Sequence, residues 1–285
     1  MSQNQEETKP SEKKETEVLP IYQLLSLVLE GEDVAVRDDQ YDFLWLFEAI
    51  KRSRKRGFRF RLIDSGRFDF YQLEGLIQAG ADLYTSVEVR NQINELQFIS
   101  KTAQKSKTVV AYFLQSGLEE ESNKETQSLS FADAINLAAS GVYLYFSNKK
   151  AKLNLSKLSQ VARVSHMAGS WLVYYHHGPL ESDLDKLAAS GTWIHLSNRS
   201  LQQEDELSLL LSIIKSARSF GANLIFHLEK GVDVSLVQDV VKEGAFVLFD
   251  SFLPDFKSPL YYIARKARRK KLDFRSFYLY PHFLF

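Results

Sequence analysis

Short apolar runs recur along the chain, and four of them end in the same way. Each run closes on a polar residue that stands two places before a glycine. The four segments are "FRLIDSG" (60–66), "AYFLQSG" (111–117), "VYYHHGP" (173–179) and "IFHLEKG" (225–231). Apolar runs of this length, bounded by turn residues, predict β-strands.

A second strand follows each of these segments after a stretch with helical spacing. The second strands are introduced by glycine in "AGADLYTS" (79–86), "ASGVYLYFSN" (139–148), "ASGTWIHLSN" (189–198) and "EGAFVLFDS" (243–251). The stretch before each glycine has helical spacing and ends where a helix C-cap glycine belongs. The chain therefore repeats a βαβα unit four times.

Eight strands that alternate with helices predict a parallel sheet with right-handed crossovers. The fourfold repeat of the βαβα unit favours closure into a (β/α)8 barrel of the TIM type, because closure gives equivalent places to equivalent units. An open doubly wound α/β sheet is the alternative. Two predicted helices, 18–30 and 39–56, precede the first barrel strand and are expected to pack against the barrel or plug its bottom, and 33–37 suits an accessory ninth strand.

Three regions follow from this pattern. Residues 1–17 are polar and of mixed charge, which predicts a disordered tail. Residues 18–57 hold the N-terminal helices, and residues 58–285 hold the barrel, a basic C-terminal helix and an aromatic tail. The tail "FYLYPHFLF" (277–285) is apolar enough to predict packing on the barrel or an oligomer interface.

Composition removes several classes of function. The 285 residues carry 36 basic and 36 acidic side chains, so no global field steers the chain toward nucleic acid or membrane. There is no cysteine, which excludes disulfides, thiolate nucleophiles and cysteine-ligated metals and is compatible with the cytoplasm. No apolar stretch approaches the length of about 20 residues that a transmembrane helix needs.

Alternation along the strands predicts a polar mouth at their C-terminal ends, where (β/α)8 enzymes carry their sites. One level below the rim we expect His195, His227, Tyr84, Tyr145 and Tyr174 to point inward. The same parity turns Arg61 outward, against the rule that outward positions are apolar. The rim itself is expected to contain Asp64, Gln115, His176, Glu229 and Asp250.

Two chemistries suit such a mouth. Asp64, His176 and Glu229 form a candidate divalent-metal site that would activate water for hydrolysis, with Asp250 as a further catalytic residue. Alternatively, Glu229 and Asp250 act as general acid and base. Gln115, His195, His227, Tyr84 and Tyr145 would bind a small polar substrate. The competing interpretation is a polar rim without catalysis, with the histidines as hydrogen-bonded core residues.

Two basic clusters, 51–56 and 264–271, offer a different function. In a closed barrel both would lie at the bottom and form one patch, made of Arg52, Arg54, Lys55, Arg56, Arg268, Arg269, Lys270 and Lys271. Basic residues near helix C-termini also stabilise the helix dipole, which is the structural explanation. The functional hypothesis is a scaffold or binding protein whose patch contacts nucleic acid or another anionic surface.

Overall fold

The computed structural model describes residues 20–30, 34–114, 118–119, 129–202, 206–228, 231, 233–249, 257–260 and 262–263. Within these residues nine parallel strands form one sheet, in the order β1-β2-β3-β4-β7-β8-β9-β10-β11. The strands are β1 (Val34–Arg37), β2 (Phe60–Ile63), β3 (Ala81–Ser86), β4 (Val110–Leu114), β7 (Tyr143–Ser147), β8 (Leu172–Tyr175), β9 (Trp193–Ser197), β10 (Leu224–Leu228) and β11 (Phe246–Phe249). Two further short strands, β5 (Leu118–Glu119) and β6 (Leu129–Ser130), pair with each other.

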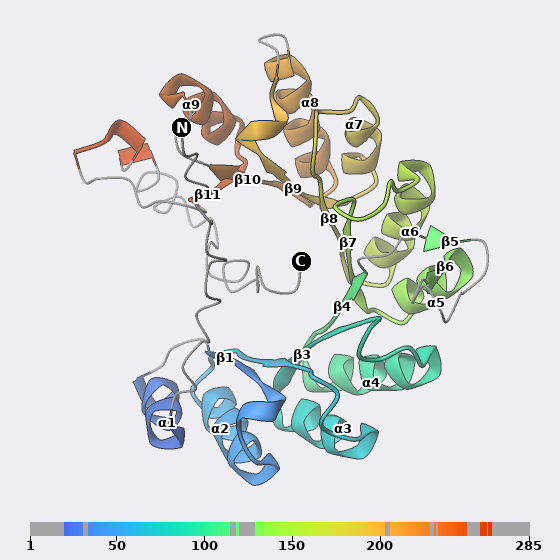
Figure 1. The fold of residues 1–285 in the computed structure, drawn as a ribbon, viewed down its shortest axis with the longest axis vertical. Coiled ribbons are helices and arrows are strands. Elements are labelled where there is room, and N and C mark those ends of the chain that lie inside the picture. The colour runs from blue at the N-terminus through green and yellow to red at the C-terminus, as the bar shows by residue number, and fades with distance from the viewer. Residues whose placement is uncertain are drawn as a thin grey trace, which may run out of the picture.

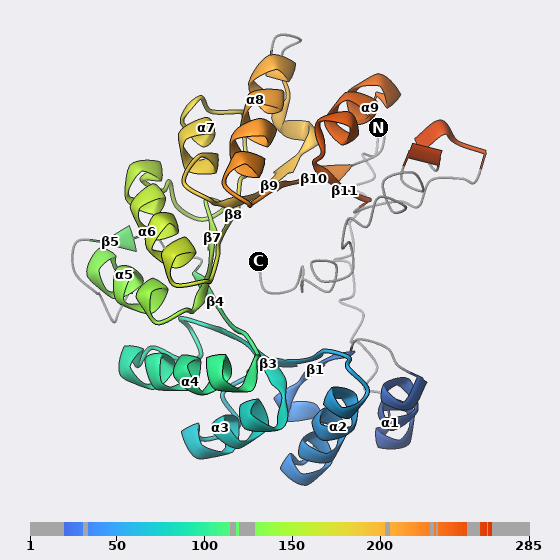
Figure 2. The same cartoon turned by 180° about the vertical axis from the view of Figure 1, so that it is seen from behind.

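The helices cover one face of the sheet. They are α1 (Ile21–Glu30), α2 (Phe43–Lys55), α3 (Phe70–Ala79), α4 (Ile93–Ser106), α5 (Phe131–Ala139), α6 (Leu155–Met167), α7 (Asp183–Ala188), α8 (Glu206–Ser219) and α9 (Val234–Glu243), with single 3-10 turns at Asp38–Gln40 and Asn198–Ser200. The sheet curves into an arc with the helices outside it (Figures 1 and 2). We call the helix-covered side the outer face and the concave side the inner face.

This architecture confirms the predicted TIM-type α/β fold. The strand order follows the chain and helices cover a single face, whereas a doubly wound sheet reverses its order and carries helices on both faces. All eight predicted strands are present. Among the described residues the pairing runs from β1 to β11, and no strand pairing joins these two ends of the arc.

The ninth strand predicted at 33–37 is β1 (Val34–Arg37), and it lies in the main sheet beside β2. As a result α2 is the crossover helix between β1 and β2, and it lies in the outer layer between α1 and α3 (Figure 1). Of the two positions expected for this helix, packing on the outside of the sheet is the observed one. The predicted tail at 1–17 lies outside the described residues.

A repeated contact between a side chain and a glycine connects neighbouring outer helices in pairs. At the end of α2, α4, α6 and α8, one side chain lies against the glycine that terminates the following helix. The pairs are Arg54 with Gly80, Gln104 with Gly141, His166 with Gly191, and Arg218 with Gly244. Arg54 also donates from Nη1 to the carbonyl of Gln78 (2.8 Å) and from Nη2 to that of Ser106 (3.1 Å). The fourfold sequence repeat thus has a packing counterpart in the helix layer.

Candidate active site

The alternation of side chains decides which residues of β9 and β10 face inward. Ile194, Leu196, Leu224 and Phe226 belong to the large core shared with the outer helices. Their neighbours His195 and His227 therefore point to the inner face, as the sequence predicts. No helix covers that side of the sheet among the described elements.

The two imidazoles are in direct contact. His195 Nδ1 and His227 Nε2 are 2.8 Å apart, and both side chains are buried. One nitrogen donates and the other accepts, so a single proton lies between them. Histidine is a common general acid or base, so this contact marks the inner face of β9 and β10 as a candidate site.

Tyr175 and His177 of the neighbouring strand complete the group. The Tyr175 ring stacks on His195 with 4.0 Å between centroids. His177 lies two residues after the end of β8 and is exposed, and its backbone is held by Asn148, whose Oδ1 accepts from His177 N (2.6 Å) and whose Nδ2 donates to its carbonyl (2.8 Å). Desolvation, aided by the positive charge of Lys149, lowers the pKa of His177, so this imidazole is neutral at pH 7.

An aromatic cluster continues the inner face away from the histidines. Tyr84, Phe113 and Tyr145 follow one another across β3, β4 and β7 and pack in a cluster of their own with Ile63, Ala111 and Val173. The Phe113 and Tyr145 rings stack at 4.5 Å, and Tyr84 lies 6.2 Å from Phe113. Tyr84 and Tyr145 thus point inward as the sequence predicts, and Tyr175, which stacks on His195, also packs against this cluster.

The structure corrects the position of Asp64. Phe60 and Leu62 of β2 lie in the outer core, so Asp64 shares their direction and points outward. There it accepts from Thr85 Oγ1 (2.8 Å) and forms two hydrogen bonds with Arg90, at 2.8 and 3.1 Å. Its side chain is fully buried and that of Arg90 is 14% exposed. Asp64 is a structural ion-pair partner between the sheet and the loop after β3.

His176 is displaced in the same way. Tyr174, which the sequence predicted to point inward, belongs with Leu172 to the outer core, and His176 continues their direction. Its Nε2 lies 2.7 Å from the Pro179 carbonyl and its Nδ1 lies 3.5 Å from the Tyr174 hydroxyl. These contacts hold the turn after β8. Asp64 and His176 therefore do not converge on the inner face, and the proposed metal triad loses two of its three ligands.

A shift of one residue explains both errors. Counted back from the glycine, the outward positions of β2 are Phe60 and Leu62 before Gly66, whereas those of β10 are Phe226 and Leu228 before Gly231. Because side chains alternate, one residue of slip reverses the face on which each side chain lies. Aligning the repeats by their glycines therefore gives the right inward set for β10 and the wrong one for β2 and β8.

The same slip brings Arg61 to the inner face, where the sequence parity did not place it. Arg61 is buried and stands beside Asp82 in the β2–β3 ladder. Asp82 in turn accepts from Arg59 Nη1 (2.8 Å) and from the Val109 backbone (2.9 Å). These charges lie at the N-terminal end of the strands, below the histidines. In the sequence, an arginine at a position predicted to face the helices was the signal that strand β2 had been aligned one residue out of register.

Three predicted site residues, Gln115, Glu229 and Asp250, lie outside the described residues, and so do Arg268, Arg269, Lys270 and Lys271. In the part of the chain that the structure describes, no three histidine or acidic side chains come together as a metal-binding group. Within the same part, no helix is long and apolar enough to cross a membrane.

The basic cluster of α2 serves partly as a set of helix caps. Arg54 donates to the ends of α3 and α4, as described above, and Arg56 Nη1 donates to the Leu29 carbonyl at the end of α1. The remaining cations behave differently. Arg52 lies 3.9 Å from Glu48, and Lys51 lies over the Phe47 ring at 5.1 Å from its centroid.

No protein-family model and no curated protein matches the sequence. Solved structures with a similar backbone include a mandelate racemase/muconate lactonizing protein from Herpetosiphon aurantiacus (12% identity, TM-score 0.35), with 81% of this chain and 60% of that chain covered. Another is 3-dehydroquinate dehydratase from Geobacillus kaustophilus (12% identity, TM-score 0.34), with 72% of this chain and 86% of that one covered. The chain thus spans about 60% of the length of the first of these proteins. Likeness at this level carries no activity over to the chain.

Proposed function

We propose that the protein is an enzyme that moves protons on a small polar molecule bound at the inner face of the sheet. The observation that carries this proposal is the buried contact of 2.8 Å between His195 and His227. It lies on two adjacent strands toward their C-terminal ends, the location of active sites in this fold class. A hydrogen-bonded imidazole pair offers a donor and an acceptor at neutral pH.

The neighbouring groups support the same chemistry. His177 is neutral at pH 7 because its pKa is lowered, so its free nitrogen can accept a proton from a substrate. Tyr175 stacks on His195 and restricts the orientation of that imidazole. The aromatic cluster of Tyr84, Phe113 and Tyr145 adds an apolar surface next to Tyr175. These residues thus supply acid, base and an apolar surface.

The metal-assisted hydrolase expected from the sequence receives no support from the described geometry. Two members of its metal triad, Asp64 and His176, face the outer layer and are committed to structural hydrogen bonds. We therefore keep general acid–base catalysis in the proposal, and histidines take the roles that the sequence analysis gave to Glu229 and Asp250. The reaction class we propose is therefore proton transfer to and from carbon of a small polar molecule.

The test begins with small carboxylates, phosphates and amines that raise the melting temperature of the purified protein. Each such compound is then incubated with the protein in D₂O, and loss of a C–H signal in its proton NMR spectrum reports enzyme-catalysed exchange. We expect the exchange rate to fall by about 10²- to 10⁴-fold in His195→Asn and His227→Gln, the range for loss of a general acid or base. These amides keep a hydrogen-bonding atom at the position of the contacting nitrogen and remove its titration.

His166→Gln is the matched control, because His166 lies on α6 against Trp171, away from the inner face. The control variant should exchange protons at the wild-type rate. Compounds that bind without any exchange, or exchange that survives both substitutions at the imidazole pair, would refute the proposal.

A further inference from the structure

The exposed stripe of α2 changes character along its length. Leu44, Trp45, Glu48, Lys51, Arg52 and Lys55 follow one another at helical spacing on the solvent side of this helix. Leu44 is 74% exposed and Trp45 is 50% exposed, which is unusual for two adjacent large apolar side chains. The stripe therefore begins apolar and ends basic.

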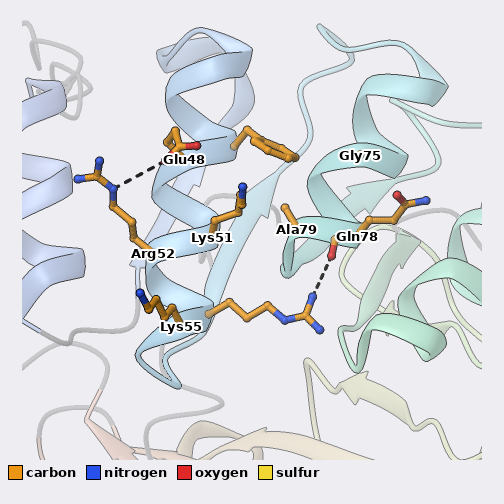
Figure 3. A pocket seen from close by; sticks show the side chains of 9 residues that line it. Glu48, Lys51, Arg52, Lys55, Gly75, Gln78 and Ala79 are labelled. Atoms are coloured by element: carbon orange, nitrogen blue, oxygen red, sulfur yellow. Dashed lines mark hydrogen bonds and ion pairs between the residues drawn. The ribbon is translucent and has the colours of Figure 1, made fainter.

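Two hollows follow the seam between α2 and α3. The larger, of about 830 Å³, has an apolar floor made by Phe47 of α2 and by Gly75 and Ala79 of α3. The smaller, of about 510 Å³, lies at the N-terminal ends of the same helices and includes Leu44 and Trp45. Small residues on α3 keep the seam open, and Figure 3 shows Lys51 reaching from α2 toward it with Ala79 on the facing helix.

Three cations around the larger hollow form no short ion pair within the described residues. Arg54 is committed to the carbonyls of Gln78 and Ser106, but Lys51 contacts an aromatic face and Arg52 has only a distant partner in Glu48. Lys55 has no hydrogen bond or ion pair among the described residues of the chain. Three cations against one carboxylate leave this end of the seam positive.

We infer that the α2–α3 seam is a docking site for an acidic amphipathic helix of a partner protein. Apolar side chains of that helix would lie over Leu44, Trp45 and the floor at Gly75, and its carboxylates would meet Lys51, Arg52 and Lys55. The partner helix would run parallel to α2, because its negative C-terminal end is then placed against the lysines. The 13 residues of α2 limit the bound segment to about 20 Å, or roughly four helical turns.

The seam fits this occupant better than the other anionic surfaces. Nucleic acid binding requires many cations along a phosphate backbone, but this end of the seam offers three, with Glu48 beside them. An anionic membrane could touch the exposed stripe of α2 but would not fill the two hollows beside it, whereas side chains of a bound helix can. Apolar contacts at one end and charge at the other are the features of helix-in-groove recognition.

The experiment uses the full chain and three fluorescent probes. The first is a synthetic 14-residue helical peptide with leucines at helical spacing in its first half and glutamates in its second half. The second is a 16-nucleotide single-stranded DNA, and the third is a vesicle that contains phosphatidylglycerol. We expect micromolar binding of the peptide that weakens with salt, and at least tenfold weaker binding by Lys51→Gln/Lys55→Gln and by Leu44→Ser/Trp45→Ser.

The matched control is Lys215→Gln/Lys242→Gln. Lys215 occupies on α8 the place of Lys51 on α2, three residues before the arginine that caps the next helix. This variant should bind the peptide like wild type, and circular dichroism should show that all variants are folded. No peptide binding at 50 mM salt, equal weakening by the control variant, or seam-dependent binding of only DNA or vesicles would overturn the inference. None of these outcomes depends on the imidazole pair.

Discussion

Replacing Gly80 by alanine tests whether the contact between paired helices stabilises the fold. Gly80 ends α3 with a φ of +124°, a conformation that alanine adopts at a cost of about 1–3 kcal/mol. The new Cβ would also stand 2.6 Å from Arg54 Cδ. Arg54 must then move, and its hydrogen bonds to Gln78 and Ser106 are strained or lost.

The magnitude follows from these two contributions. A hydrogen bond to a charged group contributes about 1.5–3 kcal/mol, and the exposure of Arg54 reduces this because water competes for the guanidinium. We expect Gly80→Ala to lower the free energy of unfolding by about 2–4 kcal/mol. Gly57→Ala is the control, since Gly57 also has a positive φ (+82°) but no atom within 4 Å of an added Cβ. It should cost about 1–2 kcal/mol.

The assay is urea unfolding followed by circular dichroism, carried out as a double-mutant cycle with Arg54→Ala. Removing the arginine side chain beyond Cβ first should reduce the cost of Gly80→Ala by about 1–2 kcal/mol, because two residues in contact are not additive. If Gly80→Ala costs the same with and without Arg54, the arginine contact contributes nothing and backbone strain alone explains the glycine. That result would refute the interlocking of paired helices as a source of stability.

Three further predictions concern ionisable groups. Arg90→Ala should destabilise the protein by about 3–5 kcal/mol in urea unfolding, because it leaves the buried Asp64 carboxylate without its partner. Lys186→Ala removes the exposed Lys186–Asp183 pair and should have a much smaller effect; equal costs would contradict this assignment. Burial raises the pKa of Asp38, so the unfolded chain ionises this carboxyl at lower pH than the folded protein does. The unfolding free energy of wild type relative to Asp38→Asn should therefore fall as the pH rises above about 4 and level off above the raised pKa, by about 1.4 kcal/mol for each unit of pKa shift, and a flat difference would be evidence against it. Desolvation and Lys149 lower the pKa of His177, so its NMR titration midpoint should lie below about 6.5 and should rise in Lys149→Met. Stability that depends on the neutral imidazole is lost as the pH falls through about 6.5. An unchanged midpoint in the variant would exclude Lys149 as a cause of the lowered pKa.

The sequence by itself determined the order and type of the elements. Apolar runs, helical spacing and the glycines at 80 and 244 are local signals, and each of them acts through the backbone of a few adjacent residues. They were sufficient for a parallel sheet in chain order with helices between the strands. In β9 and β10, clean alternation also placed His195 and His227 on the inner face.

Tertiary structure alone decided which chemistry those strands present. The direction of Asp64 and His176 depends on where each strand enters the ladder, and a slip of one residue reverses it without changing composition or spacing. The distance between His195 and His227 depends on the stagger of β9 against β10, to which residues far apart in the chain contribute. The two hydrogen bonds between Asn148 and the His177 backbone likewise join two loops that meet only because the sheet brings their strands side by side.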